Sequence, residues 1–249
     1  MIFYFTATGN SKFVADRIAA ATNEHTKNIA DCMKDGLYSF KLHEGEMLGF
    51  VVPVYYYGVP IIVSEFLEKL DVSADHAYYS FAVLNCGSTT GDAGRFFQRA
   101  FQVDAVFGIK VVDNYVPLSK VASEAEINER LDNAEHTVGE IVAAINEKKA
   151  GKINAVAGFL PSLMTSMFYP IYKRGRKTKK FRVVDDCDGC RTCESVCPRN
   201  AIDCSNGMPV WKEPKCEICL ACLHKCPVSA IVYGRSAGKG QFINPRVEW

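Results

Sequence analysis

Residues 1–11 read MIFYFTATGNS, an apolar run followed by a loop of hydroxyl residues, a glycine and an asparagine. The run predicts a buried strand and the residues after Ser11 predict a helix, so the loop forms the turn between them. Such a loop offers hydroxyls and backbone N–H groups to an anion at a helix N-terminus. It matches neither G-x-x-x-x-G-K-[ST] nor G-x-G-x-x-G, so it favours a monophosphate over a triphosphate or a dinucleotide. Simple capping of the helix is the alternative.

Beyond this loop, apolar segments alternate with helical patterns. Strands are predicted at 1–5, 26–30, 47–52, 78–84 and 105–112, and helices from Ser11, over 60–70, from Asp92 and over 123–148. Strands that alternate with helices imply right-handed crossovers and a parallel sheet covered on both faces. The predicted fold class is therefore α/β with five parallel strands.

Two further loops follow the third and fourth predicted strands, PVYYYG at 53–58 and NCGSTTG at 85–91. In a doubly wound sheet the ligand lies outside the carboxyl ends of the strands at the switch point, so all three loops are expected to converge on one crevice. Tyrosine rings can stack on a flat ligand, and glycines let backbone amides approach it. Packing at the strand ends is the alternative for each tyrosine.

The loop at 6–11 follows the pattern [ST]-x-T-G-N-[ST], and on this motif the first 150 residues resemble flavodoxins. The resemblance implies a sheet of order 2-1-3-4-5 and an FMN whose phosphate is held by residues 6–11 and whose ring meets the two later loops. The expected FMN-binding residues are Thr6, Ala7, Thr8, Gly9, Asn10, Ser11, Pro53, Tyr55, Tyr56, Tyr57, Gly58, Asn85, Cys86, Gly87 and Gly91. Cys86, like Cys32 and Cys204, is expected to be a small buried residue rather than a redox group.

A repeat appears near the other end: CDGCRTCESVCPRNAI from Cys187 and CEICLACLHKCPVSAI from Cys216 align without a gap. In C-x-x-C-x-x-C-x-x-x-C-P the first three cysteines wrap one iron–sulfur cube, and the fourth ligates the cube of the other run. This assigns two 4Fe–4S clusters to two ligand sets: Cys187, Cys190, Cys193 and Cys226, and Cys216, Cys219, Cys222 and Cys197. Residues 181–235 thereby resemble bacterial-type two-cluster ferredoxins. Zinc is the alternative, but zinc ribbons use paired cysteines with longer spacers.

The rest of the sequence indicates the cellular location, the class of partner and the segment that connects the two halves. The net charge of +1 argues against nucleic acid as a partner of the whole chain, and the N-terminus lacks the pattern of a signal peptide, so a cytoplasmic protein with reduced thiols is expected. An apolar stretch at 153–172 and a basic run at 173–180 predict a linker over 151–180. Prolines and hydroxyls argue against a transmembrane helix there. A peripheral membrane contact, or docking of an acidic redox protein on the basic run, are the alternatives to a solvated linker.

The two halves together resemble iron–sulfur flavoproteins, with a flavodoxin-like domain at 1–150, the linker at 151–180, and a small α+β ferredoxin domain with a C-terminal extension at 181–249. The resemblance implies an electron-transfer protein that relays single electrons between the clusters and FMN, with ferredoxin- or flavodoxin-type partners. Two alternatives stay open: a flavin-dependent reductase of a small molecule, and a ferredoxin with a flavin-free docking domain. No catalytic acid or base and no NAD(P) site is evident.

Overall fold

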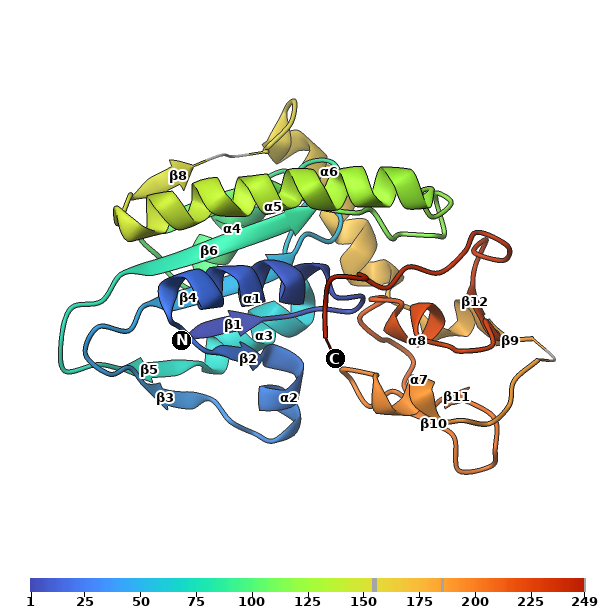
Figure 1. Cartoon of the computed structure of the whole chain (residues 1–249). Coiled ribbons are helices and arrows are strands. Elements are labelled where there is room, and N and C mark those ends of the chain that lie inside the picture. The colour runs from blue at the N-terminus through green and yellow to red at the C-terminus, as the bar shows by residue number, and fades with distance from the viewer. Residues whose placement is uncertain (154–155, 185, 249) are drawn as a thin grey trace.

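The computed structural model describes residues 1–153, 156–184 and 186–248. Its centre is a parallel sheet of order β2-β1-β4-β6-β7-β8 (Figure 1). The strands are β1 (Ile2–Tyr4), β2 (Thr26–Asn28), β4 (Leu48–Pro53), β6 (Ser80–Cys86), β7 (Ala105–Lys110) and β8 (Gly151–Ile153). The five predicted strands have the predicted order 2-1-3-4-5, which confirms the doubly wound, flavodoxin-like topology.

The predicted number of strands is one too low, because β8 extends the sheet at the edge of β7. Gly151 pairs with Ala105, and the Gly151 N–H donates to the carbonyl of Asp104 at 2.8 Å. This short strand covers polar groups that β7 would otherwise leave open to pairing. A separate parallel pair, β3 (Ser39–Lys41) and β5 (Asp71–Ser73), lies outside the main sheet.

Helices cover both faces of the sheet. The helices α1 (Asn10–Thr22) and α5 (Glu124–Asn146) pack on one face, and α2 (Ile29–Lys34), α3 (Ile61–Lys69) and α4 (Ala93–Ala100) pack on the other. Every residue of β6 is buried, which explains why its sequence is a continuous apolar run and not an alternating one. The two layers hold the carboxyl ends of β1, β4, β6 and β7 in fixed positions.

The stretch expected as a linker contains β8, α6 (Pro161–Gly175) and the 3₁₀ helix η1 (Thr178–Lys180). Residues 154 and 155 of this stretch lie outside the described residues. Pro161 suits the first turn of α6, where its missing N–H has no intrahelical partner to lose. The helix buries Thr165, Tyr169 and Tyr172. Among the described residues, no helix combines the length and the apolar character needed to cross a bilayer.

The C-terminal part is small and mixed. It comprises β9 (Phe181–Val183), α7 (Thr192–Ser195), β10 (Ile202–Asp203), β11 (Val210–Trp211), α8 (Ala221–His224) and β12 (Ile231–Tyr233), with β9 antiparallel to β12 and β10 antiparallel to β11. The sequence repeat is also a repeat of backbone conformation. Left-handed residues stand at equal positions in the two runs: Gly189 and Ile218, Arg191 and Leu220, and Asn200 and Ser229.

Candidate functional site

The loop after β1 holds an open helix N-terminus. The hydroxyl of Thr6 accepts the Gly9 N–H at 3.0 Å, and Gly9 has a φ of 100°, a left-handed conformation that glycine adopts without strain. No side chain caps α1. The first turn of this 13-residue helix can therefore donate to an anion with the support of its dipole.

Hydrogen bonds tie this loop to its neighbours. Ser11 donates to the amide oxygen of Asn85 at 2.8 Å, which joins the loop after β1 to the end of β6. The Asn10 amide donates to the Val112 carbonyl at 2.8 Å, which joins it to the segment after β7. From the C-terminal segment, the Asn244 N–H donates to the Thr8 carbonyl at 2.8 Å. These hydrogen bonds therefore join segments that lie far apart in the sequence.

The three predicted loops line one cavity of about 300 Å³, at the low end of the volumes typical of small-molecule sites. Twelve predicted residues line it: Thr6, Ala7, Thr8, Asn10, Ser11, Pro53, Tyr55, Tyr56, Tyr57, Asn85, Cys86 and Gly87. Three do not: Gly9 is the N-cap residue of α1, Gly58 lies against the ring of Tyr169, and Gly91 lies against Tyr57 and Thr165. Cys86 is buried, and burial raises the pKa of its thiol to about 12. Its role as a small buried residue stays a prediction.

The tyrosine loop is a tight turn with strained residues at its centre. The N–H of Tyr55 donates to the Gly58 carbonyl at 2.8 Å and the N–H of Gly58 donates to the Tyr55 carbonyl at 3.0 Å, while Tyr56 and Tyr57 have φ values of 50° and 65°. Aromatic residues in the left-handed region cost about 1–3 kcal/mol each, and such strain is concentrated at functional sites. The turn places its three tyrosines in the wall of the cavity.

Contacts to other elements fix these rings. The hydroxyls of Tyr56 and Tyr115 lie 2.6 Å apart, and the Tyr56 ring stacks on Tyr172 of α6 with centroids 5.8 Å apart. Burial raises the pKa of Tyr115, and the hydrogen bond to Tyr56 raises it further. The Tyr115 phenol is therefore neutral, and the wall offers flat aromatic faces with a hydroxyl donor.

A methyl group at Gly58 tests the packing of this turn on α6. Its Cβ would clash with the Tyr169 ring, so we expect Gly58→Ala to lower the free energy of unfolding by about 1–3 kcal/mol. The matched control is Gly139→Ala in α5, where a Cβ meets nothing within 4 Å. That change is expected to add about 1 kcal/mol, because alanine is the better helix former. Urea unfolding of both variants measures the difference; equal stability of the two contradicts the clash.

The cysteines of the two runs line two small cavities in the C-terminal part. Cys226 shares a cavity with the first three cysteines of the other run, Cys187, Cys190 and Cys193. Cys197 likewise shares a cavity with Cys216, Cys219 and Cys222. Each cavity therefore brings three cysteines of one run together with the fourth of the other.

The spacing of the sulfurs does not match a single tetrahedral metal ion. Tetrahedral zinc with bonds of about 2.3 Å requires its sulfurs within roughly 4 Å of one another. Among the described residues, no three cysteine sulfurs lie within 4.8 Å of one another. Backbone N–H groups point at the sulfurs of two candidate ligands: Ala201 donates to Cys197 at 3.3 Å and Ala230 to Cys226 at 3.2 Å. Such bonds stabilise thiolates bound to iron.

A fifth cysteine lies beside the first set. The Sγ of Cys204 is 3.6 Å from that of Cys193, and Cys204 lines the same cavity. Cys204 is buried, as expected from its sequence, but its position beside a candidate ligand was not foreseen.

Burial raises the pKa of the Cys216 thiol, in the second set, to about 11, so a thiolate there requires a compensating cation.

The two kinds of site meet at Cys219. This residue lines the cavity of the second cysteine set and also the large cavity of the three loops. Its neighbours Ile218 and Leu220 line both as well. Tyr55 lines the large cavity together with Cys219. Burial raises the pKa of Tyr55 well above its usual value, with a smaller contribution from Cys219. A redox group at each cavity would be separated by little more than these side chains.

Several lining residues were missed by sequence reasoning. The segment after β7 contributes Val111, Val112, Asp113, Asn114 and Tyr115, and Leu118 follows it. Phe168 and Tyr172 of α6 complete the wall. The segment after β7 was foreseeable, because it leaves the carboxyl edge of the sheet like the other loops. The α6 residues carried no such signal.

Comparisons with known proteins give matches near both ends of the chain. The flavodoxin domain family (Flavodoxin_5) matches residues 1–105, and the 4Fe-4S binding domain family (Fer4) matches residues 182–203. Ferredoxin-2 of Chlorobaculum tepidum is 35% identical over 57 residues, which are 20% of this chain and 92% of that protein. An azoreductase structure from Bacillus anthracis covers 59% of this chain and 98% of its own, with 9% identity and a TM-score of 0.33.

The family matches support flavin binding near the N-terminus, 4Fe–4S binding near the C-terminus and a role in electron transfer. The chain therefore belongs to the iron–sulfur flavoproteins, in which an N-terminal flavodoxin domain is fused to a C-terminal ferredoxin domain.

Proposed function

We propose that the chain relays single electrons between two 4Fe–4S clusters and FMN, and that it divides into an FMN domain at 1–150, a connecting segment at 151–180 and a ferredoxin domain at 181–249. FMN exchanges one or two electrons and each cluster exchanges one, so their union converts single-electron transfer into two-electron chemistry. The observation that carries the proposal is Cys219, whose side chain belongs to the walls of both cavities.

The residues of the large cavity suit FMN in both of its parts. The uncapped start of α1 and the hydroxyls of Thr6, Thr8 and Ser11 suit a phosphate. The rings of Tyr55, Tyr56 and Tyr57 suit stacking on the isoalloxazine.

The eight cysteines of the two runs are the proposed cluster ligands, with the fourth cysteine exchanged between the runs. Within the first set, Cys190 is exposed, whereas Cys216 and Cys222 of the second set are buried. A redox partner of the ferredoxin or flavodoxin type would therefore meet the first set at the surface, and the second set would lie between it and the flavin cavity.

Cofactor content is the first test. We expect protein purified without oxygen to contain about eight iron atoms, eight sulfides and one FMN per chain. The measurements are iron and sulfide assays, electron paramagnetic resonance of the reduced protein, and the flavin released on denaturation. An iron content without FMN would mean a ferredoxin with a docking domain; about two metal ions with no sulfide would mean zinc sites.

The route through Cys219 is the second test. Cys219→Ser is expected to slow FMN reduction by an external donor more than Cys190→Ser does, because both replace one ligand but only Cys219 also lines the flavin cavity. Stopped-flow absorbance at constant iron content measures this. Equal rates contradict the relay. Rapid catalytic reoxidation by one class of quinone, nitro compound or enoyl substrate would instead favour the reductase.

A further inference from the structure

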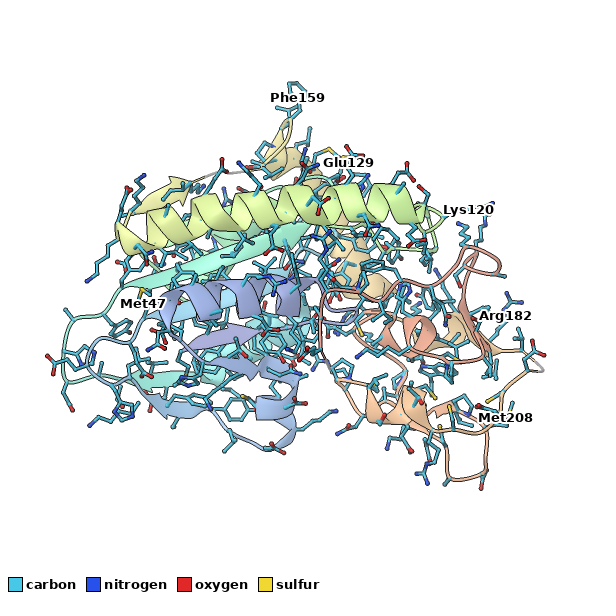
Figure 2. All side chains as sticks on the ribbon, in the orientation of Figure 1. Met47, Lys120, Glu129, Phe159, Arg182 and Met208 are labelled. Atoms are coloured by element: carbon cyan, nitrogen blue, oxygen red, sulfur yellow. The ribbon has the colours of Figure 1, made fainter. Side chains whose placement is uncertain are left out.

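The outer face of α6 is apolar and unusually exposed. Five of the eleven large hydrophobic side chains that are exposed in the described residues lie within 13 residues of sequence. Phe159 is 86% exposed, and Figure 2 shows it projecting away from the rest of the molecule. The other four are Leu160, Leu163, Met167 and Ile171, each between 51% and 56% exposed. A contiguous exposed apolar patch usually marks an interaction site.

The spacing of these residues shows that α6 is apolar on two sides. Leu163, Met167 and Ile171 follow one another at intervals of four and share the outer face. The inner face carries Thr165, Tyr169 and Tyr172, which are buried. Surface helices normally carry polar residues on the outward face. The outer face of α6 thus has the composition of a face that contacts something apolar.

The surrounding charge indicates what that contact is. Residues 148–184 contain ten lysines and arginines and neither aspartate nor glutamate. Directly after the apolar stripe, Lys173, Arg174, Lys177, Lys179 and Lys180 are all exposed. A protruding apolar stripe next to clustered cations is the pattern of a helix that lies in the interface of an anionic bilayer.

We infer that α6 docks the protein on an anionic lipid surface, with residues 159–171 in the headgroup and upper acyl region and the basic run on the headgroups. A second copy of the chain fits less well, because it would set two cation-rich segments side by side, whereas lipid phosphates neutralise them. An acidic protein would neutralise the cations but leaves the protruding Phe159 unexplained.

Docking through α6 would place the large cavity close to the lipid surface. Phe168 and Tyr172, on the inner side of α6, line that cavity, and Leu118, 80% exposed, lines it too. With the outer face of α6 on the membrane, the cavity stands one helix away from the lipid surface. This consequence rests on the proposed function, but the docking itself does not depend on the cofactors.

Vesicle sedimentation of the full chain, purified without oxygen, tests the inference. We expect sedimentation with vesicles that contain phosphatidylglycerol and little with pure phosphatidylcholine, and we expect added salt to weaken it. The variant Leu163→Ser/Met167→Ser/Ile171→Ser is expected to bind more than about tenfold more weakly, because three apolar side chains no longer enter the interface. Lys177→Glu/Lys179→Glu/Lys180→Glu is expected to lose at least as much, since each cation contributes about fivefold.

The matched control is Leu37→Ser/Met208→Ser/Val210→Ser, three exposed hydrophobic residues elsewhere, which should bind as the unmodified chain does. Three results would overturn the inference: no sedimentation of the unmodified chain, equal binding of the α6 variant and the control, or a dimer in light scattering that the α6 variant abolishes. Iron and FMN counts on the same samples separate this outcome from a failure of the proposed function.

Discussion

Two double variants are expected to lose different amounts of iron although each removes two cysteines. If the fourth cysteine is exchanged, Cys187 and Cys226 serve one cluster, and Cys187→Ala/Cys226→Ala should retain about four iron atoms per chain. Cys187 and Cys197 serve different clusters, so Cys187→Ala/Cys197→Ala should retain almost none. The physical reason is the pair of cavities, in which Cys226 lies with the first run and Cys197 with the second.

The assay is iron and sulfide per chain, with electron paramagnetic resonance to identify the surviving cluster. The single variant Cys187→Ala supplies the reference for the loss of one ligand, and Cys32→Ala, a buried cysteine outside both cavities, should lose no iron. If each run instead held its own cluster, the two double variants would exchange their results. That reversal would refute the exchanged assignment outright.

The alternation of apolar runs with helical patterns was sufficient for a parallel sheet, because crossovers have one hand, and the strand order followed from the resemblance to flavodoxins. It was insufficient for β8, a three-residue strand of sequence GKI whose pairing depends on the free edge of β7. No local pattern distinguishes such a segment from a loop. The helix α6 was obscured for a related reason: Pro161 and Pro170 suggest a linker, yet the first begins the helix and the second lies within it.

The candidate site was predictable where chemistry is local and hidden where it depends on tertiary contacts. The hydroxyls and glycine of residues 6–11 predict an anion loop, with helix capping as the alternative. Asn244 holds that loop from more than 200 residues away, and its amide donates to the Asn10 side chain at 3.2 Å. Tyr172, on α6, lines the large cavity of the three loops. Contacts of this kind have no signature in a single sequence.

A buried carboxylate joins the two parts of the protein, and its removal is expected to have a large effect. The side chain of Glu217 is fully buried beside Cys216. Its carboxylate accepts two bonds from Arg199, at 2.7 and 2.9 Å, and one from the Ile62 N–H at the start of α3, at 3.3 Å. Pro60, the N-cap residue of α3, has no side chain that can cap the helix. Glu217 instead supplies a negative charge to the N-terminus of α3.

Further residues belong to this network, among them Arg176, whose guanidinium pairs with Glu217 at 3.5 Å. The phenol of Tyr172 donates to Glu217 in a short hydrogen bond, and burial together with the carboxylate charge raises the pKa of Tyr172, so the phenol stays protonated. Arg199 also pairs with Glu65 of α3. Glu217 therefore connects α3, α6 and the second cysteine run at one point, next to the cavity that Cys219 shares.

We expect Glu217→Ala to lower the free energy of unfolding by about 3–5 kcal/mol, because it leaves the Arg199 guanidinium without its buried partner and the Ile62 N–H of α3 without its acceptor. Glu217→Gln keeps the shape and part of the hydrogen bonding and should lose less. The control is Glu213→Ala, an exposed site four residues away, where a change within about 0.5 kcal/mol is expected. Urea unfolding of cofactor-loaded protein gives the midpoints, and iron counts on each variant exclude cluster loss as the cause.

A double-mutant cycle separates the ion pair from the cap. If the charge pair dominates, Arg199→Ala should recover part of the loss caused by Glu217→Ala, because the cation that lost its buried partner is then removed as well. If the cap on α3 dominates, the two losses should add. A Glu217→Ala variant as stable as Glu213→Ala would mean that the two parts are held together without this network, and that apolar contacts around Tyr172 and Ile218 suffice.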